Sequence, residues 1–273
     1  MTKELFIVKR SLVLALGLLV VGYAAGCGGS EPADTAQQAP ATGTAPAPGG
    51  AQPAQPTGGS SVTGTVTFAG SPPNLKPLSM DADPACAQKH SAPVPAEMLV
   101  LGDGNTMGNT IVWVSNGLPA GKTWAAPTTP VVLDQVGCQY RPHAMGIMVG
   151  QAYRILNSDG ILHNVHALPK INPSFNQPMP ATMKEKTVTF SRPEPVFQIK
   201  CDVHPWMMAY VGVFTHPFFS VTNTDGKFTI QGLDAGTYEI TAWHERLGTQ
   251  KASLTVTGSD SKTQDFKFAV PTT

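Results

Sequence analysis

The sequence predicts an all-β protein, and three observations lead to that prediction. Short runs of alternating residues recur along the chain, as in Val62, Gly64, Val66 and Phe68, which share one face of a predicted strand. Gly, Pro, Asn and Asp separate these runs, as is typical of turns. Beyond residue 60 no segment has a convincing helical period. The roughly 213 residues that remain there suffice for one or two β domains with cores of their own.

Residues 1–27 have the features of an export signal. Basic residues precede a short apolar run, and small residues lead up to Cys27. This pattern describes a secretory signal, and the run is too short to predict a membrane span. The Ala-Gly-Cys ending resembles a bacterial lipoprotein signal, although Ala24 stands where Leu is usual. The resemblance implies a lipid on Cys27, a membrane anchor and a location on the periplasmic or cell-surface face. An ordinary cleaved signal is the alternative.

Residues 28–60 consist almost entirely of Gly, Ala, Pro, Thr, Gln and Ser. A segment of this composition cannot bury enough apolar surface to offset its ordering entropy. We therefore predict a disordered linker, which would let a folded head range away from a membrane anchor.

The stretch Cys201-Asp-Val-His204-Pro-Trp-Met207 places a thiol, an imidazole and a thioether within seven residues. The residues ahead of Cys201 alternate between apolar and polar, so its sulfur should point from a strand into a core. The proline helps to end that strand and turn the chain back. His163 offers a second imidazole. Two imidazoles, a thiolate and a weak thioether are the donor set of a blue-copper electron-transfer site.

This stretch resembles the copper loop of the cupredoxins, above all the amicyanin-like branch, in its Cys-x-x-His-Pro-aromatic-Met spacing. The segment that begins at His163 resembles the His-Asn-Val pattern in which these proteins place their first histidine. The two motifs occur in the right order, about 40 residues apart. The resemblance implies one type 1 copper ion, bound by His163, Cys201, His204 and, weakly, Met207, with Asn164 holding the Cys201 loop in place.

Two residues compete with these ligands. His166 lies three residues after His163, so the two side chains would point to opposite faces of a strand, and the motif favours His163. Met208 competes with Met207, and the spacing favours Met207.

Trp206 has two interpretations, which the sequence leaves open. It is either a packing aromatic beside the site or, with Pro205, part of an apolar patch around an exposed His204 where an electron partner docks. For the whole site, the simplest alternative is a buried core thiol at Cys201 with incidental histidines.

Cys86 and Cys138 remain once the lipidated cysteine and the copper ligand are set aside. In an oxidising compartment we expect them to form a disulfide, worth about 4 kcal/mol in the chain-entropy model. The alternative combines Cys86, His90, Cys138 and His143 in a second metal site. Because Cys-x3-His and Cys-x4-His are loose spacings, we favour the disulfide.

Two β-sandwiches follow from this organisation. We expect a cupredoxin-like Greek-key sandwich over residues 131–216. Residues 217–273 contain Asp-Gly-Lys-Phe-x-Ile and Ala-Gly-Thr-Tyr signatures that resemble the carboxypeptidase regulatory-like sandwich, a transthyretin-like fold, with a hairpin expected over residues 222–230. The usual first strand of that fold is missing there and present near residue 61. We therefore expect residues 61–130 to complete the second sandwich around an inserted copper domain.

The sequence favours a carrier over an enzyme. It has no His-x-His motif of the kind that multicopper oxidases need, and no Ser-His-Asp signature or phosphate-binding loop stands out. Its 18 basic and 18 acidic residues balance, which argues against nucleic acid as a partner.

We expect a copper protein that exchanges single electrons with redox proteins of the cell envelope. The alternatives are copper capture or delivery, and a structural or carbohydrate-binding-like envelope module. His216 and His244 receive no role.

Overall fold

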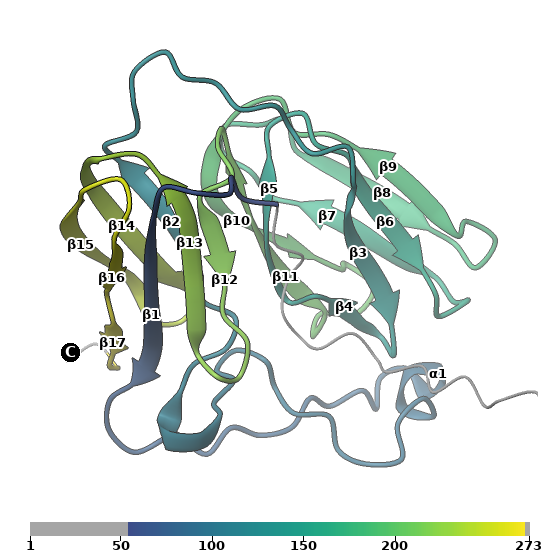
Figure 1. The fold of residues 1–273 in the computed structure, drawn as a ribbon. Coiled ribbons are helices and arrows are strands. Elements are labelled where there is room, and N and C mark those ends of the chain that lie inside the picture. Colours follow the sequence, from purple (N-terminus) through teal and green to yellow (C-terminus); the bar gives the residue numbers. More distant parts are fainter. Residues whose placement is uncertain (1–53, 271–273) are drawn as a thin grey trace, which may run out of the picture. The chain divides into compact units, whose positions relative to one another are not determined.

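The computed structural model describes residues 54–270, so the export signal, Cys27 and most of the expected linker lie outside the described residues. The all-β class is confirmed, since strands account for nearly all regular structure (Figure 1). Among residues 54–270 the two helical segments are single turns, far shorter than a bilayer-spanning helix. The elements are β1 (Ser60–Phe68), α1 (Pro84–Ala87), the 3-10 turn η1 (Asp103–Asn105), β2 (Ile111–Asn116), β3 (Val131–Val136), β4 (Gln139–Arg141), β5 (Ala144–Met148), β6 (Tyr153–Asn157), β7 (His163–Ala167), β8 (Phe175–Met179), β9 (Glu185–Val188), β10 (Glu194–Lys200), β11 (Met208–Phe214), β12 (Phe219–Val221), β13 (Lys227–Leu233), β14 (Gly236–His244), β15 (Gly248–Val256), β16 (Ser261–Thr263) and β17 (Phe266–Phe268).

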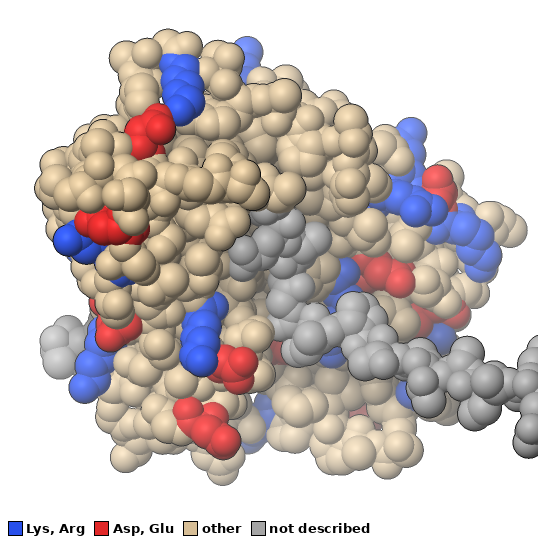
Figure 2. All heavy atoms as spheres, viewed as in Figure 1, with Lys and Arg blue, Asp and Glu red and all other residues tan. Residues whose placement is uncertain are grey.

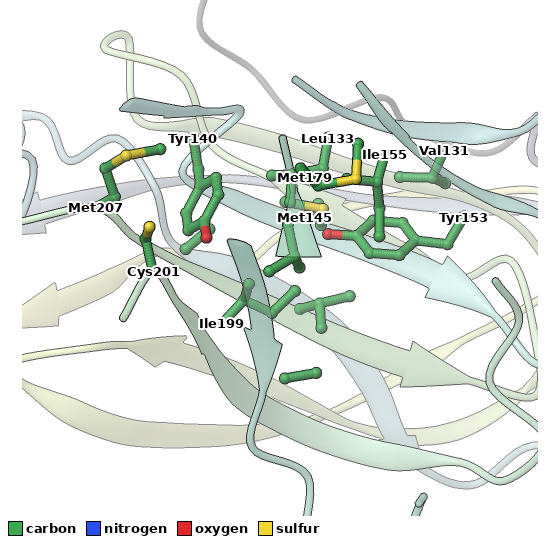
Figure 3. Packing of buried hydrophobic residues seen from close by; sticks show 14 of the residues in the cluster. Val131, Leu133, Tyr140, Met145, Tyr153, Ile155, Met179, Ile199, Cys201 and Met207 are labelled. Carbon is green, nitrogen blue, oxygen red and sulfur yellow. The ribbon is translucent and has the colours of Figure 1, made fainter. Parts of the chain in front are cut away.

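The first core lies between two sheets that run through the middle of the chain. One sheet has the strand order β5-β11-β10-β7-β8 and the other β4-β3-β6-β9. Alternate residues of these strands point inward, as Val131 and Leu133 do on β3, because side chains of a strand alternate between its two faces. Figure 3 shows Cys201, Met207 and Tyr140 at one end of this packed cluster.

The second core combines the two ends of the described chain. Its sheets have the orders β13-β1-β16, with β17 also pairing β1, and β12-β2-β14-β15. Strand β1 pairs antiparallel with β13 from Thr65 opposite Lys227 to Ser60 opposite Leu233. Gln55, inside the segment expected to be linker, also contacts this sheet, since its side chain accepts from the Gln231 N–H at 2.7 Å.

The expected hairpin over residues 222–230 is wrong. Strand β12 pairs with β2, and β13 pairs with β1, so the Asp-Gly turn connects strands of two different sheets. Gly226 has φ +66 in this turn, and its carbonyl accepts from the Val66 N–H at 2.8 Å. A Cβ there would lie 2.4 Å from the Val66 oxygen, so this close approach requires glycine.

Residues 61–130, which were expected in the second sandwich, contribute to both cores and to a third cluster, in which Ile111 and Trp113 lie with residues of β5 and β11. Strands β1 and β2 enter the second core, but Met80, Cys86 and Val94 pack into the first. The segment between β1 and β2 is rich in proline and contains no strand. It is linked to the first core through the disulfide from Cys86 to Cys138, and not through the hydrogen bonds of a sheet. Lys and Arg are mixed with Asp and Glu over the described part of the face in Figure 2, without a large patch of one sign.

Candidate metal centre

Three buried donors converge where strands β7 and β10 of the first core meet. His163 opens β7, Cys201 follows the last residue of β10, and His204 lies in the loop that leads to β11. The Nδ1 atoms of the two histidines are 2.9 Å apart, and the Cys201 Sγ lies 3.8 Å from the His204 Nδ1. The three ligand atoms all lie within 4.8 Å of one another.

The loop after β10 turns back on itself through its own backbone. The Cys201 N–H donates to the Met207 carbonyl at 3.1 Å, and the Met207 N–H donates to the His204 carbonyl at 2.9 Å. The His204 N–H points at the Cys201 sulfur, 3.4 Å away. This tight return begins directly after β10 ends at Lys200, and it brings the thiol and the imidazole to one point.

Each imidazole uses its far nitrogen to bind a carboxylate. His163 donates from Nε2 to Asp159 Oδ2 at 2.9 Å, and His204 donates from Nε2 to Asp83 Oδ2 at 2.9 Å. In a neutral imidazole one nitrogen carries the proton and the other is an acceptor. When both rings are neutral, both Nδ1 atoms are therefore acceptors, and two facing acceptors need a proton or a cation between them. Burial would lower the pKa of His163, but its hydrogen bonds with Asp159 and Cys201 raise that pKa, so a proton can take this place in the metal-free protein. With a thiol sulfur beside them, these residues fit a thiophilic metal ion.

The surroundings of Cys201 favour its thiolate form. Burial alone would raise the pKa of this thiol, but hydrogen bonds from His163 and from the N–H groups of Asn164, His204 and Val203 outweigh it and lower the pKa below its ordinary value. A deprotonated sulfur is the form that binds metals.

Asp159 keeps its charge inside the protein. Burial would raise its pKa, but hydrogen bonds from His163, Lys89 and the Cys138 and Gly137 N–H groups lower the pKa to about 2. The carboxylate thus stays ionised and holds the His163 ring in one tautomer.

Asn164 ties the two donor segments together. Its Oδ1 accepts from the Asp202 N–H at 2.7 Å and lies 3.3 Å from the Cys201 Sγ. Its Nδ2 donates to Asn176 at 2.6 Å, and its carbonyl accepts from the Tyr140 hydroxyl. The structure therefore places Asn164 where it fixes the Cys201 loop against β7.

The two competing residues have other partners. His166 is half-buried on the opposite face of β7, and its Nδ1 lies 2.9 Å from Asp202 Oδ2. The Met208 sulfur accepts from Gln198 Nε2 at 3.1 Å. Met207 is buried in the same core cluster as Cys201, as Figure 3 shows.

The interpretation that placed Trp206 in an apolar patch around an exposed His204 is wrong, because the His204 side chain is only 1% exposed. A segment of residues 80–90, here named the cap, supplies Asp83 to its Nε2 edge. Trp206 packs on the ring with centroids 5.1 Å apart and donates from Nε1 to the Cys138 carbonyl at 3.1 Å. In this structure Trp206 is a packing aromatic.

Cys86 and Cys138 form a disulfide, with Cα atoms 5.6 Å apart. His90 donates from Nε2 to the Gly137 carbonyl at 2.7 Å, and His143 binds Glu245. These four residues therefore do not assemble the second metal site considered from the sequence.

The sequence analysis missed both carboxylates. Asp159 stands four residues before His163 in the turn ahead of β7, which is a signal that could have been noticed. Asp83 is 121 residues from His204, in an irregular proline-rich segment, and no local sequence pattern indicates that the two residues are in contact. His216 and His244 belong to none of the groups that could hold a metal ion among residues 54–270.

No protein-family model and no curated protein matches this chain. Among solved structures, a copper-containing nitrite reductase from Thermus scotoductus SA-01 matches with 22% identity and a TM-score of 0.29, over 37% of this chain and 25% of that one. The chain thus spans about a quarter of the reductase. A Cu(I) form of an amicyanin variant matches with 19% identity and a TM-score of 0.28, over 37% of this chain and 97% of amicyanin. These scores are low, so the assignment below rests on the site itself.

Proposed function

We propose that this chain binds one copper ion through His163, Cys201 and His204, with Met207 as a weak fourth donor, and carries single electrons. The observation that supports it most is the pair of imidazole Nδ1 acceptors that face each other at 2.9 Å beside a buried thiol. Each Nε2 is already committed to a carboxylate, so the donors are oriented for a cation that prefers nitrogen and sulfur.

Bound copper would supply a reversible one-electron couple, while the protein sets its potential and access. The chain contributes rigidity. Asn164 fixes the Cys201 loop, and Asp159 and Asp83 hold the rings. Ligands held in this way move little when an electron arrives, which favours rapid exchange. This role is that of a carrier and not of an enzyme.

We propose that the protein works outside the cytoplasm, tethered by a lipid on Cys27, with redox proteins of the envelope as partners. The export-type N-terminus supports this location. The Cys86–Cys138 disulfide supports it independently, because such bonds persist in oxidising compartments.

The test is a visible absorption spectrum of the disulfide-intact protein after addition of one equivalent of Cu(II). We expect an intense blue band from thiolate-to-copper charge transfer. Cys201→Ala should abolish the band, and Met207→Leu should retain copper and shift its potential. The matched control is His166→Ala, which removes a nearby histidine that does not converge on the site. A Cys201→Ala protein that stays blue, or a wild-type protein that binds no copper, would refute the proposal.

Copper capture without electron transfer is the second candidate. The burial of all three donors and the carboxylate over His204 favour it, because they favour retention of the ion over exchange with a partner. Protein-film voltammetry separates the two functions. A carrier cycles reversibly at fast scan rates, whereas a capture protein loses or traps its copper when the oxidation state changes.

A further inference from the structure

The cap reaches the metal centre through one side chain, Asp83. Both of its carboxylate oxygens are engaged. Oδ1 accepts from the Ala85 N–H at 2.8 Å, which caps the one-turn helix α1, and Oδ2 accepts from His204 Nε2 at 2.9 Å. A side chain bound at both oxygens has little freedom, so the position of α1 decides where the carboxylate meets the imidazole.

Three anchors hold α1 and the rest of the cap over the site. The Cys86–Cys138 disulfide fixes the helix itself. Lys89 pairs with Asp159 at 3.1 Å, and His90 donates to the Gly137 carbonyl at 2.7 Å. The cap therefore touches both carboxylate–imidazole arms of the site, directly at His204 and through Lys89 at His163.

The two carboxylates differ in their charge. Asp159 shares its negative charge with Lys89, but the ion pairs described for residues 54–270 give Asp83 no lysine or arginine partner. The Asp83 side chain is 33% exposed, so water partly screens its charge, but no lysine or arginine among these ion pairs offsets it. A carboxylate that accepts from the far nitrogen of a ligating histidine fixes its tautomer and makes the ring a stronger donor. A stronger and more negative donor favours Cu(II) over Cu(I).

We propose that Asp83 is a positioning residue of the copper centre, which the disulfide-anchored cap delivers to His204 and which sets the relative affinity of the site for Cu(II) and Cu(I). This inference rests on the proposed copper function and goes beyond it. It gives the segment ahead of the metal-binding strands control over the redox balance.

Two substitutions separate the roles of Asp83. Asp83→Asn removes the charge and keeps one oxygen, which can still accept from the Ala85 N–H, while the amide NH2 that then faces His204 Nε2 cannot accept its proton. Asp83→Ser keeps a side-chain acceptor at the N-terminus of α1, since serine is a favoured N-cap residue, and its side chain is too short to reach the His204 ring. The matched control is Asp81→Asn, which removes the same charge from an exposed position in the same segment, where Asp81 contacts the Ser79 hydroxyl.

We would measure the Cu(II) and Cu(I) dissociation constants and the midpoint potential of each variant. Both Asp83 variants should lose about tenfold in affinity for Cu(II), the low end of the usual effect of such partners, and should keep their affinity for Cu(I). For a one-electron couple, that ratio equals an upward shift of about 59 mV. Asp81→Asn should match the wild type. Nitrogen-15 NMR of the metal-free protein gives a copper-independent readout, in which His204 Nε2 should carry the proton in the wild type and lose that preference in Asp83→Ser.

The outcomes distinguish the two levels of inference. A wild-type protein without a blue copper band would refute the proposed function. A blue wild-type protein in which both Asp83 variants, with intact disulfide and native circular dichroism, keep the wild-type potential and the His204 tautomer would refute the role of Asp83 alone. Equal potential shifts in the Asp83 variants and Asp81→Asn would also refute it, because they would show a general charge effect.

Discussion

The first and second cores of this protein use the same kind of secondary structure but differ in the polar groups that they bury together. In the second core, Thr222 is a buried polar side chain with a partner of its own, since it donates to the Met107 carbonyl at 2.6 Å. In the first core, His163 and His204 are buried with their Nδ1 atoms 2.9 Å apart beside Cys201, and in the neutral rings both of these atoms are acceptors. A polar group that is satisfied from within stabilises a fold, whereas one that needs an external ion marks a site.

The largest expected change in stability comes from a substitution that opens a cavity in the second core. Phe228 is buried there against Phe266, with ring centroids 6.0 Å apart. Phe228→Ala should lower the free energy of unfolding by about 3–5 kcal/mol. Because no residue of the metal centre belongs to this cluster, the folded variant should keep the wild-type copper spectrum. Urea unfolding and visible absorption together test this, and a lost or altered copper band in folded protein would show that the two cores are not independent.

The next effect is a pH dependence of stability that originates at His216. This side chain is packed among aromatic rings, and burial lowers its pKa to about 4. The unfolded chain binds this proton near its ordinary pKa of about 6.5. Stability should therefore be intact above about pH 6.5 and fall as the pH drops toward 4, by up to about 3 kcal/mol.

Urea midpoints at pH 7 and pH 4.5 measure the total loss, to which His244 contributes as well, because burial also lowers its pKa to about 4. His216→Gln should reduce the difference between the two midpoints, and His166→Gln, which alters a more accessible histidine, should leave it unchanged. Identical pH profiles for His216→Gln and the wild type would contradict the assignment.

A smaller stability effect, with a larger consequence for metal, is expected at Asn164. Asn164→Ala leaves the Asp202 N–H without its partner and frees the Cys201 loop, at a cost of about 1–3 kcal/mol. Copper affinity should fall by about 10–100-fold, because the sulfur is no longer held in place. Asn176→Ala removes an exposed neighbour of the same network and serves as the control. If Asn164→Ala kept the wild-type copper affinity, the backbone hydrogen bonds of the Cys201 loop would be sufficient to hold its sulfur in place.

The smallest effect concerns His166, which pairs with Asp202 near the surface. His166→Ala should change the free energy of unfolding by no more than about 1 kcal/mol, as is usual for such pairs. The same variant should retain the blue band. If it removed the band, the choice of His163 over His166 as the donor would be wrong.

Local patterns in the sequence, together with the resemblance to the cupredoxin copper loop, named three residues that the structure brings together, His163, Cys201 and His204. The alternation ahead of Cys201 placed its sulfur inside, and the opposite faces of one strand separated His163 from His166. Both features depend on a few adjacent residues, which is the range over which periodicity carries information.

The environment of His204 could not be read in this way. Its exposure was judged from the loop motif alone, but the cap comes from 121 residues away and has no ladder to give it a register. The expected hairpin failed for a related reason. Asp225-Gly226 fixes a turn, but the strands on either side of it pair with β2 and β1, which lie more than 100 residues earlier in the sequence.

The disulfide also constrains how the protein matures. The described residues contain three cysteines, and only the Cys86–Cys138 pairing leaves the Cys201 sulfur available. Oxidation of Cys201 with either of the others would at once destroy the donor and release the cap from its proper place. If copper occupies the site as proposed, early loading would protect Cys201 from thiol exchange. The metal would then act as a guide to correct oxidation before it acts in electron transfer.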